Sequence, residues 1–148
     1  MTVSRVCQRQ VDLVDLDESA WTAAERMHQR AVGSLIVLNR ERQPIGILTD
    51  QDLVVKVIAA ERVPRTTRVR DIMTAPVKTV PESASLKRAL ALMCDGKLRR
   101  LPVVDAVGRL VGILALDDVL AHLAHEFHDI GRILDQQTPR AVVAPPSE

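Results

Sequence analysis

Two closely similar stretches decide how this chain is organised: GILTDQDLV at Gly46–Val54 and GILALDDVL at Gly112–Leu120. They stand 66 residues apart, and the same offset aligns Val11–Leu53 with Val77–Val119 without a gap. Eleven of those 43 aligned pairs are identical. Repetition at a fixed period is typical of a duplicated structural unit, so we interpret the chain as two copies of one fold.

Each copy has the same order of predicted elements. A short extended stretch precedes a helix whose apolar residues recur at i, i+3, i+4 and i+7, with Ser19 and Ser85 as the expected N-caps. Two apolar runs joined by a polar turn follow, and a second helix closes the copy. The predicted strands are Leu35–Leu38, Ile45–Leu48, Leu101–Val104 and Val111–Leu114, and the closing helices span about Asp50–Ala60 and Asp117–Leu134. This order predicts an α/β (α+β) fold of two pseudo-symmetric β-α-β-β-α units.

One unit of about fifty residues has too little core to stand alone. We therefore expect the copies to pack about a pseudo-twofold axis, with Met27 and Met93 buried in equivalent positions. The predicted division is 8–60 for the first copy, 61–76 for a polar linker, 77–134 for the second copy and 135–148 for a flexible tail. Residues 1–10 and the Pro-rich stretch Thr138–Glu148 are expected to lie outside the repeat and to be mobile.

Composition limits the classes of function. The 20 basic and 19 acidic residues give a net charge of +1, so no global field attracts nucleic acid or an anionic membrane. No apolar run reaches the ~20 residues of a membrane helix and no signal peptide is apparent, which predicts a cytoplasmic protein without a membrane partner. Nucleic-acid binding through the linker arginines is not favoured, because stacking aromatics are absent there. Cys7 and Cys94 have no metal or disulfide spacing and are expected to be free thiols.

The two quoted stretches, the linker DIMTAPVKTV (Asp71–Val80) and the strand KLRRLPVVD (Lys97–Asp105) resemble a tandem pair of cystathionine β-synthase-type (CBS) domains, the Bateman module. The resemblance covers roughly residues 8–128. It implies a regulatory module, not an enzyme, for energy sensing and signal transduction. Its clefts would bind AMP, ADP, ATP or S-adenosylmethionine as a regulatory ligand, not a cofactor, and signal by a conformational change.

The family pattern assigns nucleotide binding in the first copy to Thr49, Asp50 and Asp52, where a strand ends and a helix begins. Free backbone N–H groups at a helix start suit a phosphate, and a carboxylate can accept hydrogen bonds from ribose hydroxyls. The alternative is that Thr49 or Asp50 only caps the helix and that Asp52 complements its dipole. Both interpretations stay open.

In the family, basic residues just before the second strand of one copy approach the phosphates of a ligand whose ribose is bound by the opposite copy. This implies phosphate binding by Arg99 and Arg100, with Lys97 as a weaker candidate, although a solvated loop is the alternative. The second copy keeps Asp118 but has Ala115 in place of Thr49, and the first copy has Gly33 and Ser34 in place of the arginines. We therefore predict one good nucleotide cleft in each chain and a second, weaker one at Asp118.

Other interpretations remain. The chain lacks a nucleophile elbow and a phosphate-cradling glycine loop, so no catalytic residue is predicted. His122, His125 and His128 could offer a metal two ligands on one helix face, but we interpret them as a polar face or dimer contact. Family modules dimerise through their helices, and the apolar first closing helix (Val54, Val55, Val57, Ile58) predicts a homodimer. The rival to ligand sensing is a ligand-independent interaction or scaffold module, and the regulated partner protein is not identified.

Overall fold

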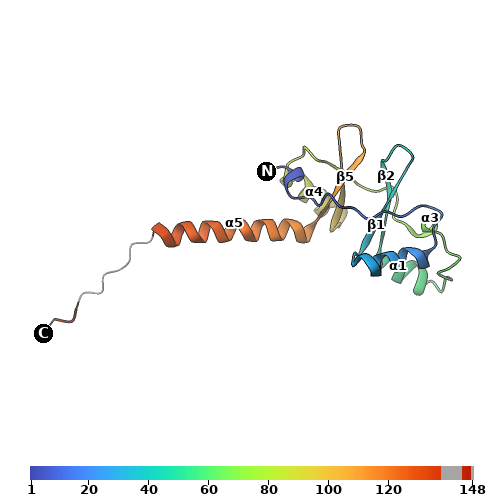
Figure 1. Ribbon diagram of the computed structural model, residues 1–148, viewed down its shortest axis with the longest axis horizontal. Helices are drawn as coiled ribbons and strands as arrows, with labels where there is room; N and C mark the ends of the chain where they lie inside the picture. The colour runs from blue at the N-terminus through green and yellow to red at the C-terminus, as the bar shows by residue number, and fades with distance from the viewer. Residues whose placement is uncertain (138–144, 148) are drawn as a thin grey trace.

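The computed structural model describes residues 1–137 and 145–147, and Figure 1 shows a body of two parts from which one long helix projects. In chain order the elements are η1 (Val3–Arg5), α1 (Ala20–Arg30), β1 (Ser34–Leu38), β2 (Pro44–Thr49), α2 (Asp50–Leu53), η2 (Val54–Ile58), α3 (Val69–Ile72), β3 (Val80–Pro81), α4 (Leu86–Gly96), β4 (Arg100–Val104), β5 (Leu110–Ala115) and α5 (Leu116–Gln137). Most of the predicted mobile tail, Thr138–Glu148, lies outside the described residues.

The hairpins of the two copies have the same register. Leu35 pairs with Leu48 in the β1–β2 hairpin, and Leu101 pairs with Leu114 in the β4–β5 hairpin. Both hairpins also shift register at the equivalent step, just before Leu38 in one and Val104 in the other. The four predicted strands are confirmed, each starting one residue earlier than predicted, and the α+β class is confirmed with them.

The helices that precede the hairpins are equally matched. Ser19 Oγ accepts a hydrogen bond from the Thr22 N–H at 3.1 Å, and Ser85 Oγ accepts one from the Arg88 N–H at 3.1 Å, so both predicted N-caps are confirmed. Met27 and Met93 are buried, with exposed fractions of 7% and 4%. Each methionine belongs to the apolar core of its own repeat, as the duplication predicts.

The closing helices differ between the copies. The predicted α-helix Asp50–Ala60 is instead a single α-turn, α2, followed by the π-helical η2, in which the Ala59 N–H donates to Val54 O at 2.8 Å. Four β-branched side chains lie within five residues here, and their crowding disfavours regular α-turns. In the second copy α5 is one continuous α-helix of 22 residues that ends at Gln137.

The prediction that residues 1–10 lie outside the repeat and are mobile is wrong. Two leader segments, residues 2–8 and 68–74, stand at the repeat offset from each other and are exchanged between the copies. Val3, in the first leader, is fully buried in the core of the second repeat. Ile72, in the second leader, is fully buried in the core of the first repeat. Each copy therefore completes the core of the other.

Each leader crosses a glycine of the opposite hairpin. Gln8 exchanges two backbone hydrogen bonds with Ile113, both of 2.9 Å, and a Cβ on the adjacent Gly112 would lie 2.7 Å from Gln8 O. In the first repeat a Cβ on Gly46 would lie 2.5 Å from Met73 Sδ. The leader passes so closely over the strand that these positions accept only glycine without a shift of the neighbouring atoms.

Candidate functional site

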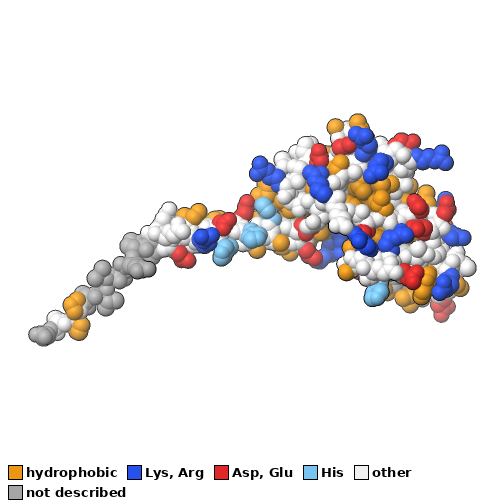
Figure 2. Space-filling view, viewed as in Figure 1, with side chains coloured by type: hydrophobic (Ala, Val, Ile, Leu, Met, Phe, Trp, Pro, Cys, Tyr) orange, Lys and Arg blue, Asp and Glu red, His pale blue; other side chains and the backbone are white. Residues whose placement is uncertain are grey.

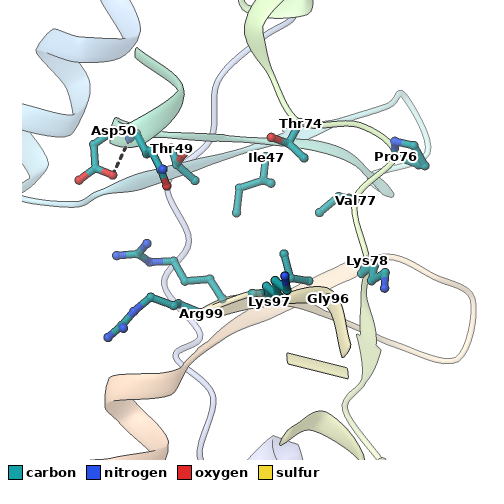
Figure 3. A pocket seen from close by; sticks show the side chains of 13 residues that line it. Ile47, Thr49, Asp50, Thr74, Pro76, Val77, Lys78, Gly96, Lys97 and Arg99 are labelled. Carbon is teal, nitrogen blue, oxygen red and sulfur yellow. Dashed lines mark hydrogen bonds between the residues drawn. The ribbon is translucent and has the colours of Figure 1, made fainter. Parts of the chain in front are cut away.

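A cleft of about 470 Å³ opens between the two repeats, in the size range of small-molecule sites (Figure 3). Its walls come from the first repeat, the second leader, the linker and the α4–β4 loop. The lining residues are Ile47, Thr49, Asp50, Gln51, Thr74, Pro76, Val77, Lys78, Gly96, Lys97, Leu98, Arg99 and Arg100. The cleft thus brings together Thr49 and Asp50 with Arg99 and Arg100, and also the weaker candidate Lys97.

One part of the cleft is apolar. Figure 3 shows the side chains of Ile47 and Val77 pointing into the same space, with Pro76 beside them, and Leu98 also lines the cleft. Ile47 is held there because its backbone exchanges hydrogen bonds of 3.1 and 2.8 Å with Thr74. The leader that follows the first repeat therefore builds one wall of the site.

The remaining lining carries four basic side chains and one acidic side chain. Arg99 Nη2 lies 3.3 Å from Asp117 Oδ1, but the two side chains are 70% and 79% exposed, so this ion pair is weak and screened by solvent. Lys78 and Lys97 belong to the same lining. The electrostatic character of the cleft is therefore cationic, with Asp50 as its single opposing charge.

Gly33 allows the two repeats to approach at the charged end. A Cβ on Gly33 would lie 3.1 Å from Asp50 Oδ2 and 3.2 Å from Arg100 Nη2. The Gly33 carbonyl also accepts a hydrogen bond from the Asp50 N–H at 3.0 Å. An added Cβ would require the ends of both flexible side chains to shift by a few tenths of an ångström, so Gly33 lies in close contact with the charged end of the cleft.

Thr49 and Asp52 form a capping box at the start of α2. Thr49 Oγ1 accepts from the Asp52 N–H at 3.2 Å, and Asp52 Oδ2 accepts from the Thr49 N–H at 3.0 Å. Asp52 Oδ1 also lies 3.0 Å from Lys56 Nζ, and Thr74 Oγ1 donates to the same carboxylate at 3.4 Å. Asp52 is only 8% exposed and does not line the cleft, so the capping interpretation describes its contacts in this structure.

The equivalent position in the second repeat has fewer contacts. Asp118 Oδ1 accepts one side-chain hydrogen bond, from Gln8 Nε2 at 3.2 Å, and Gln8 is the counterpart of Thr74. Ala115 offers no hydroxyl for a capping box, and His122 stands where the first repeat has Lys56. Asp118 is outside the lining of the described cleft.

Sequence reasoning missed the contribution of the linker. Thr74, Pro76, Val77 and Lys78 all line the cleft, although the motif that contains them supported only the family resemblance. Their role depends on the leader folding back onto β2, a non-local contact that local patterns do not show. The repeat offset of 66 residues could have found them, because it also pairs Gln8 with Thr74 and so extends the repeat into the linker.

Two further findings bear on function. Among the described residues no cluster of three or more His, Cys, Asp or Glu side chains could hold a metal ion; His122 Nε2 lies 3.4 Å from Glu126 Oε1. No helix in the described part of the chain is long and apolar enough to span a membrane.

Comparison with known proteins gives one consistent result. The CBS domain model matches residues 3–59 and 69–125. An uncharacterized protein of Methanopyrus kandleri is 39% identical over 120 residues, which cover 81% of this chain and 61% of that protein. The chain thus spans only about three fifths of this relative.

Solved structures agree with the fold. A putative signal-transduction protein with CBS domains from Burkholderia ambifaria matches with a TM-score of 0.76 and 30% identity, over 95% of this chain and all of the other. A CBS domain pair in complex with 5′-methylthioadenosine and S-adenosyl-L-methionine matches with a TM-score of 0.76 and 21% identity, over 85% of this chain and 98% of the other. At this identity the match shows the fold. Tandem CBS proteins are regulatory modules. This chain belongs to the CBS domain family and carries two CBS domains in tandem.

Proposed function

We propose that this protein is a regulatory module that binds an adenosine-containing ligand in the inter-repeat cleft, with AMP, ADP or ATP preferred to S-adenosylmethionine. The observation that carries the proposal is the cleft itself, which combines an apolar part with a cationic part and draws both repeats into one lining. A related fold in complex with adenosyl compounds supports the same ligand class.

The apolar part suits a purine ring. Ile47, Pro76, Val77 and Leu98 offer aliphatic surface, and burying it against a flat base is favourable without a directional partner. Thr49, at the end of β2, and Thr74, in the leader, supply hydroxyl groups at the same cleft. Asp52 lies directly behind both threonines, so it would reach a ribose only by giving up its contact with Thr74.

The cationic part suits phosphate. Arg99 and Arg100 present planar guanidinium groups, which match phosphate oxygens well, and Lys78 and Lys97 add positive charge. S-adenosylmethionine has a net charge of +1, because its sulfonium adds to an ammonium and a carboxylate that cancel, and four neighbouring cations disfavour it relative to an anionic nucleotide. Charge in the cleft therefore favours phosphorylated adenosine, and more strongly as phosphates are added.

Signalling follows from the position of the cleft between the repeats. A ligand that touches Thr49 in one copy and Arg100 in the other favours the arrangement that satisfies both contacts. Occupancy can shift the equilibrium only by the ligand's differential affinity for the two arrangements. We further propose that the protein is a homodimer, with the exposed side chains Val54, Val55 and Ile58 of η2 at its interface; Val57 is buried in the chain's own core.

Calorimetric titration of the full chain tests the proposal directly. We expect ATP, ADP and AMP to bind more tightly than adenosine, and S-adenosylmethionine to bind most weakly. Arg100→Ala should weaken ATP binding by roughly ten- to a hundredfold, because a charge-assisted hydrogen bond contributes about 1.5–3 kcal/mol. Adenosine binding should be unchanged in that variant. Arg109→Ala removes a comparable charge outside the lining and serves as the matched control.

The second candidate function is a scaffold that docks a partner protein without a ligand. Its supporting observation is the capping box, which engages Asp52 fully within the protein. If no adenosyl compound binds at millimolar concentration, the scaffold function replaces the sensor function.

A further inference from the structure

Asp50 is the one acidic side chain in a cleft lining that otherwise carries four basic ones. It lies at the same end of the cleft as Arg99 (Figure 3). The proposed function gives the four cations a task, the binding of phosphate, but it gives none to an acid beside them. A carboxylate close to a phosphate site repels the ligand, so its position there requires a physical explanation.

The fold does not require an acid at this position. Leu116 stands at the repeat offset from Asp50, and α5 begins there without a carboxylate on that residue. The Asp50 N–H donates to Gly33 O at 3.0 Å, and the Leu116 N–H donates in the same way to Arg99 O at 2.8 Å. The Asp50 side chain adds a hydrogen bond of 2.9 Å from the Gln51 N–H to Oδ1. A helix start with this backbone contact therefore forms without the acid.

The Asp50 carboxylate faces Arg100 of the other repeat. Asp50 Oδ2 lies 3.1 Å from the point that a Cβ on Gly33 would occupy, and Arg100 Nη2 lies 3.2 Å from the same point. Because Gly33 has no side chain, it leaves the space between the two charged ends open. The two opposite charges, one from each repeat, therefore attract each other across a short gap.

We propose that Asp50 is the internal counter-ion of Arg100 and decides which anions enter the cleft. In the empty cleft the carboxylate partly neutralises the arginine at the place where a ligand phosphate would bind. A small anion such as inorganic phosphate or pyrophosphate has only its charge with which to displace the carboxylate. A nucleotide also gains contact with the apolar part of the cleft, which offsets the cost of displacement. This inference rests on the proposed function of the site and adds to it the exclusion of simple anions.

Binding of pyrophosphate tests this role most directly, by calorimetric titration of the full chain without divalent cations. Asp50→Asn keeps an oxygen that can accept from the Gln51 N–H but removes the charge. We expect pyrophosphate to bind this variant about three- to tenfold more tightly than the wild type, because the charge that opposes it near a partly exposed arginine is gone. The measurement uses no adenosine compound, so it decides the inference even where the proposed function fails.

Nucleotides give the second measurement. ATP binding should tighten in Asp50→Asn by a similar factor, AMP binding by less, and adenosine binding not at all, because the repulsion grows with the charge of the ligand. In an Arg100→Ala background most of the gain should disappear, since Asp50 acts through that arginine. A purely structural effect of the substitution would instead change adenosine and ATP binding alike.

Asp135→Asn is the matched control, because it makes the same change in net charge outside the lining. It lies on α5, which projects from the body (Figure 1) and carries several acidic side chains (Figure 2). This variant should leave every affinity unchanged.

Three results would each overturn the counter-ion role. Asp50→Asn could weaken ATP binding, as loss of a direct ligand contact does; pyrophosphate could gain no affinity; or the gain could persist in full without Arg100. If no adenosine compound binds the wild type but pyrophosphate shows the expected gain, the proposed function fails and the counter-ion role stands.

Discussion

The two repeats share one backbone plan but differ in what surrounds the equivalent aspartates. In the first, Asp52 holds a capping box with Thr49 and pairs with Lys56, and the cleft opens beside it. In the second, Asp118 accepts one side-chain hydrogen bond from Gln8 and has no box, because Ala115 replaces the threonine. The two copies thus share the fold but differ in the polar contacts at the start of the closing helix, which are more complete in the first copy.

The largest expected effect of this difference is on binding. Asp52→Ala should weaken ATP binding by roughly ten- to a hundredfold, because the carboxylate orients Thr49 and Thr74 at the cleft wall through charged hydrogen bonds. Asp118→Ala should change it by less than about threefold. Paired titrations measure both, with Asp52→Asn as the isosteric control. Equal losses for the two alanine variants would remove the functional distinction between the repeats.

The glycines that the leaders cross extend the comparison of the two repeats to the stability of the fold. Gly112→Ala should destabilise the fold by about 1–3 kcal/mol, because the new Cβ meets the backbone oxygen of Gln8, which cannot move alone. Gly46→Ala should cost less than about 1 kcal/mol, since the opposing Met73 side chain is flexible. Urea denaturation of the two variants gives both values. A larger cost at Gly46 would show that the first leader, not the second, is the more adaptable.

Exchanging the cap residues should make the two closing helices more alike in stability. Thr49→Ala should lower the free energy of unfolding by about 1 kcal/mol, as the loss of an N-cap does, and should weaken ATP binding as well. Ala115→Thr should raise the free energy of unfolding by up to about 0.5 kcal/mol, because Asp118 is in place to complete a box. Thermal denaturation checks both variants. No change for Thr49→Ala would mean that the box adds nothing to α2.

The smallest expected effect is on acid sensitivity. The first repeat has the ion pair Arg26–Glu18, with hydrogen bonds of 2.7 and 2.8 Å, where the second has Leu92 and Ala84. The hydrogen bond from Arg26 lowers the pKa of Glu18 below its ordinary value of 4.5. The resulting stability is present above that value and is lost as pH falls through the folded pKa. Because both side chains are still partly exposed, at 32% and 26%, the pair contributes no more than about 1 kcal/mol. Arg26→Gln should abolish this pH dependence in denaturation between pH 5 and 3.

The elements predicted correctly depend on local patterns. Strands, serine caps and buried methionines follow from periodicity within one copy. The duplication and the family resemblance placed Thr49, Asp50, Arg99 and Arg100 at one cleft, whose lining contains them, but also Asp52, which the lining does not contain; nucleotide binding by these residues stays a prediction. What was missed depends on distant contacts. Val3 carries little local signal, yet it lies fully buried in a core formed mainly by residues between Val80 and Val119. The linker wall of the cleft likewise arises from packing between distant segments. The π-helical η2 is different, because the crowding of its β-branched side chains is local and the helix prediction did not weigh it.

The exchanged leaders also have a consequence for the order of folding. During synthesis residues 2–8 emerge long before the second hairpin, but their buried position, beside Ile113, does not exist until that hairpin has been made. The core of the first repeat likewise cannot be completed until α3 has been synthesised. A fragment that ends at residue 66 would therefore lack Val69 and Ile72 and expose an open core. The two domains should unfold in a single cooperative transition despite their separate cores, because neither can lose its structure without releasing a strand partner of the other.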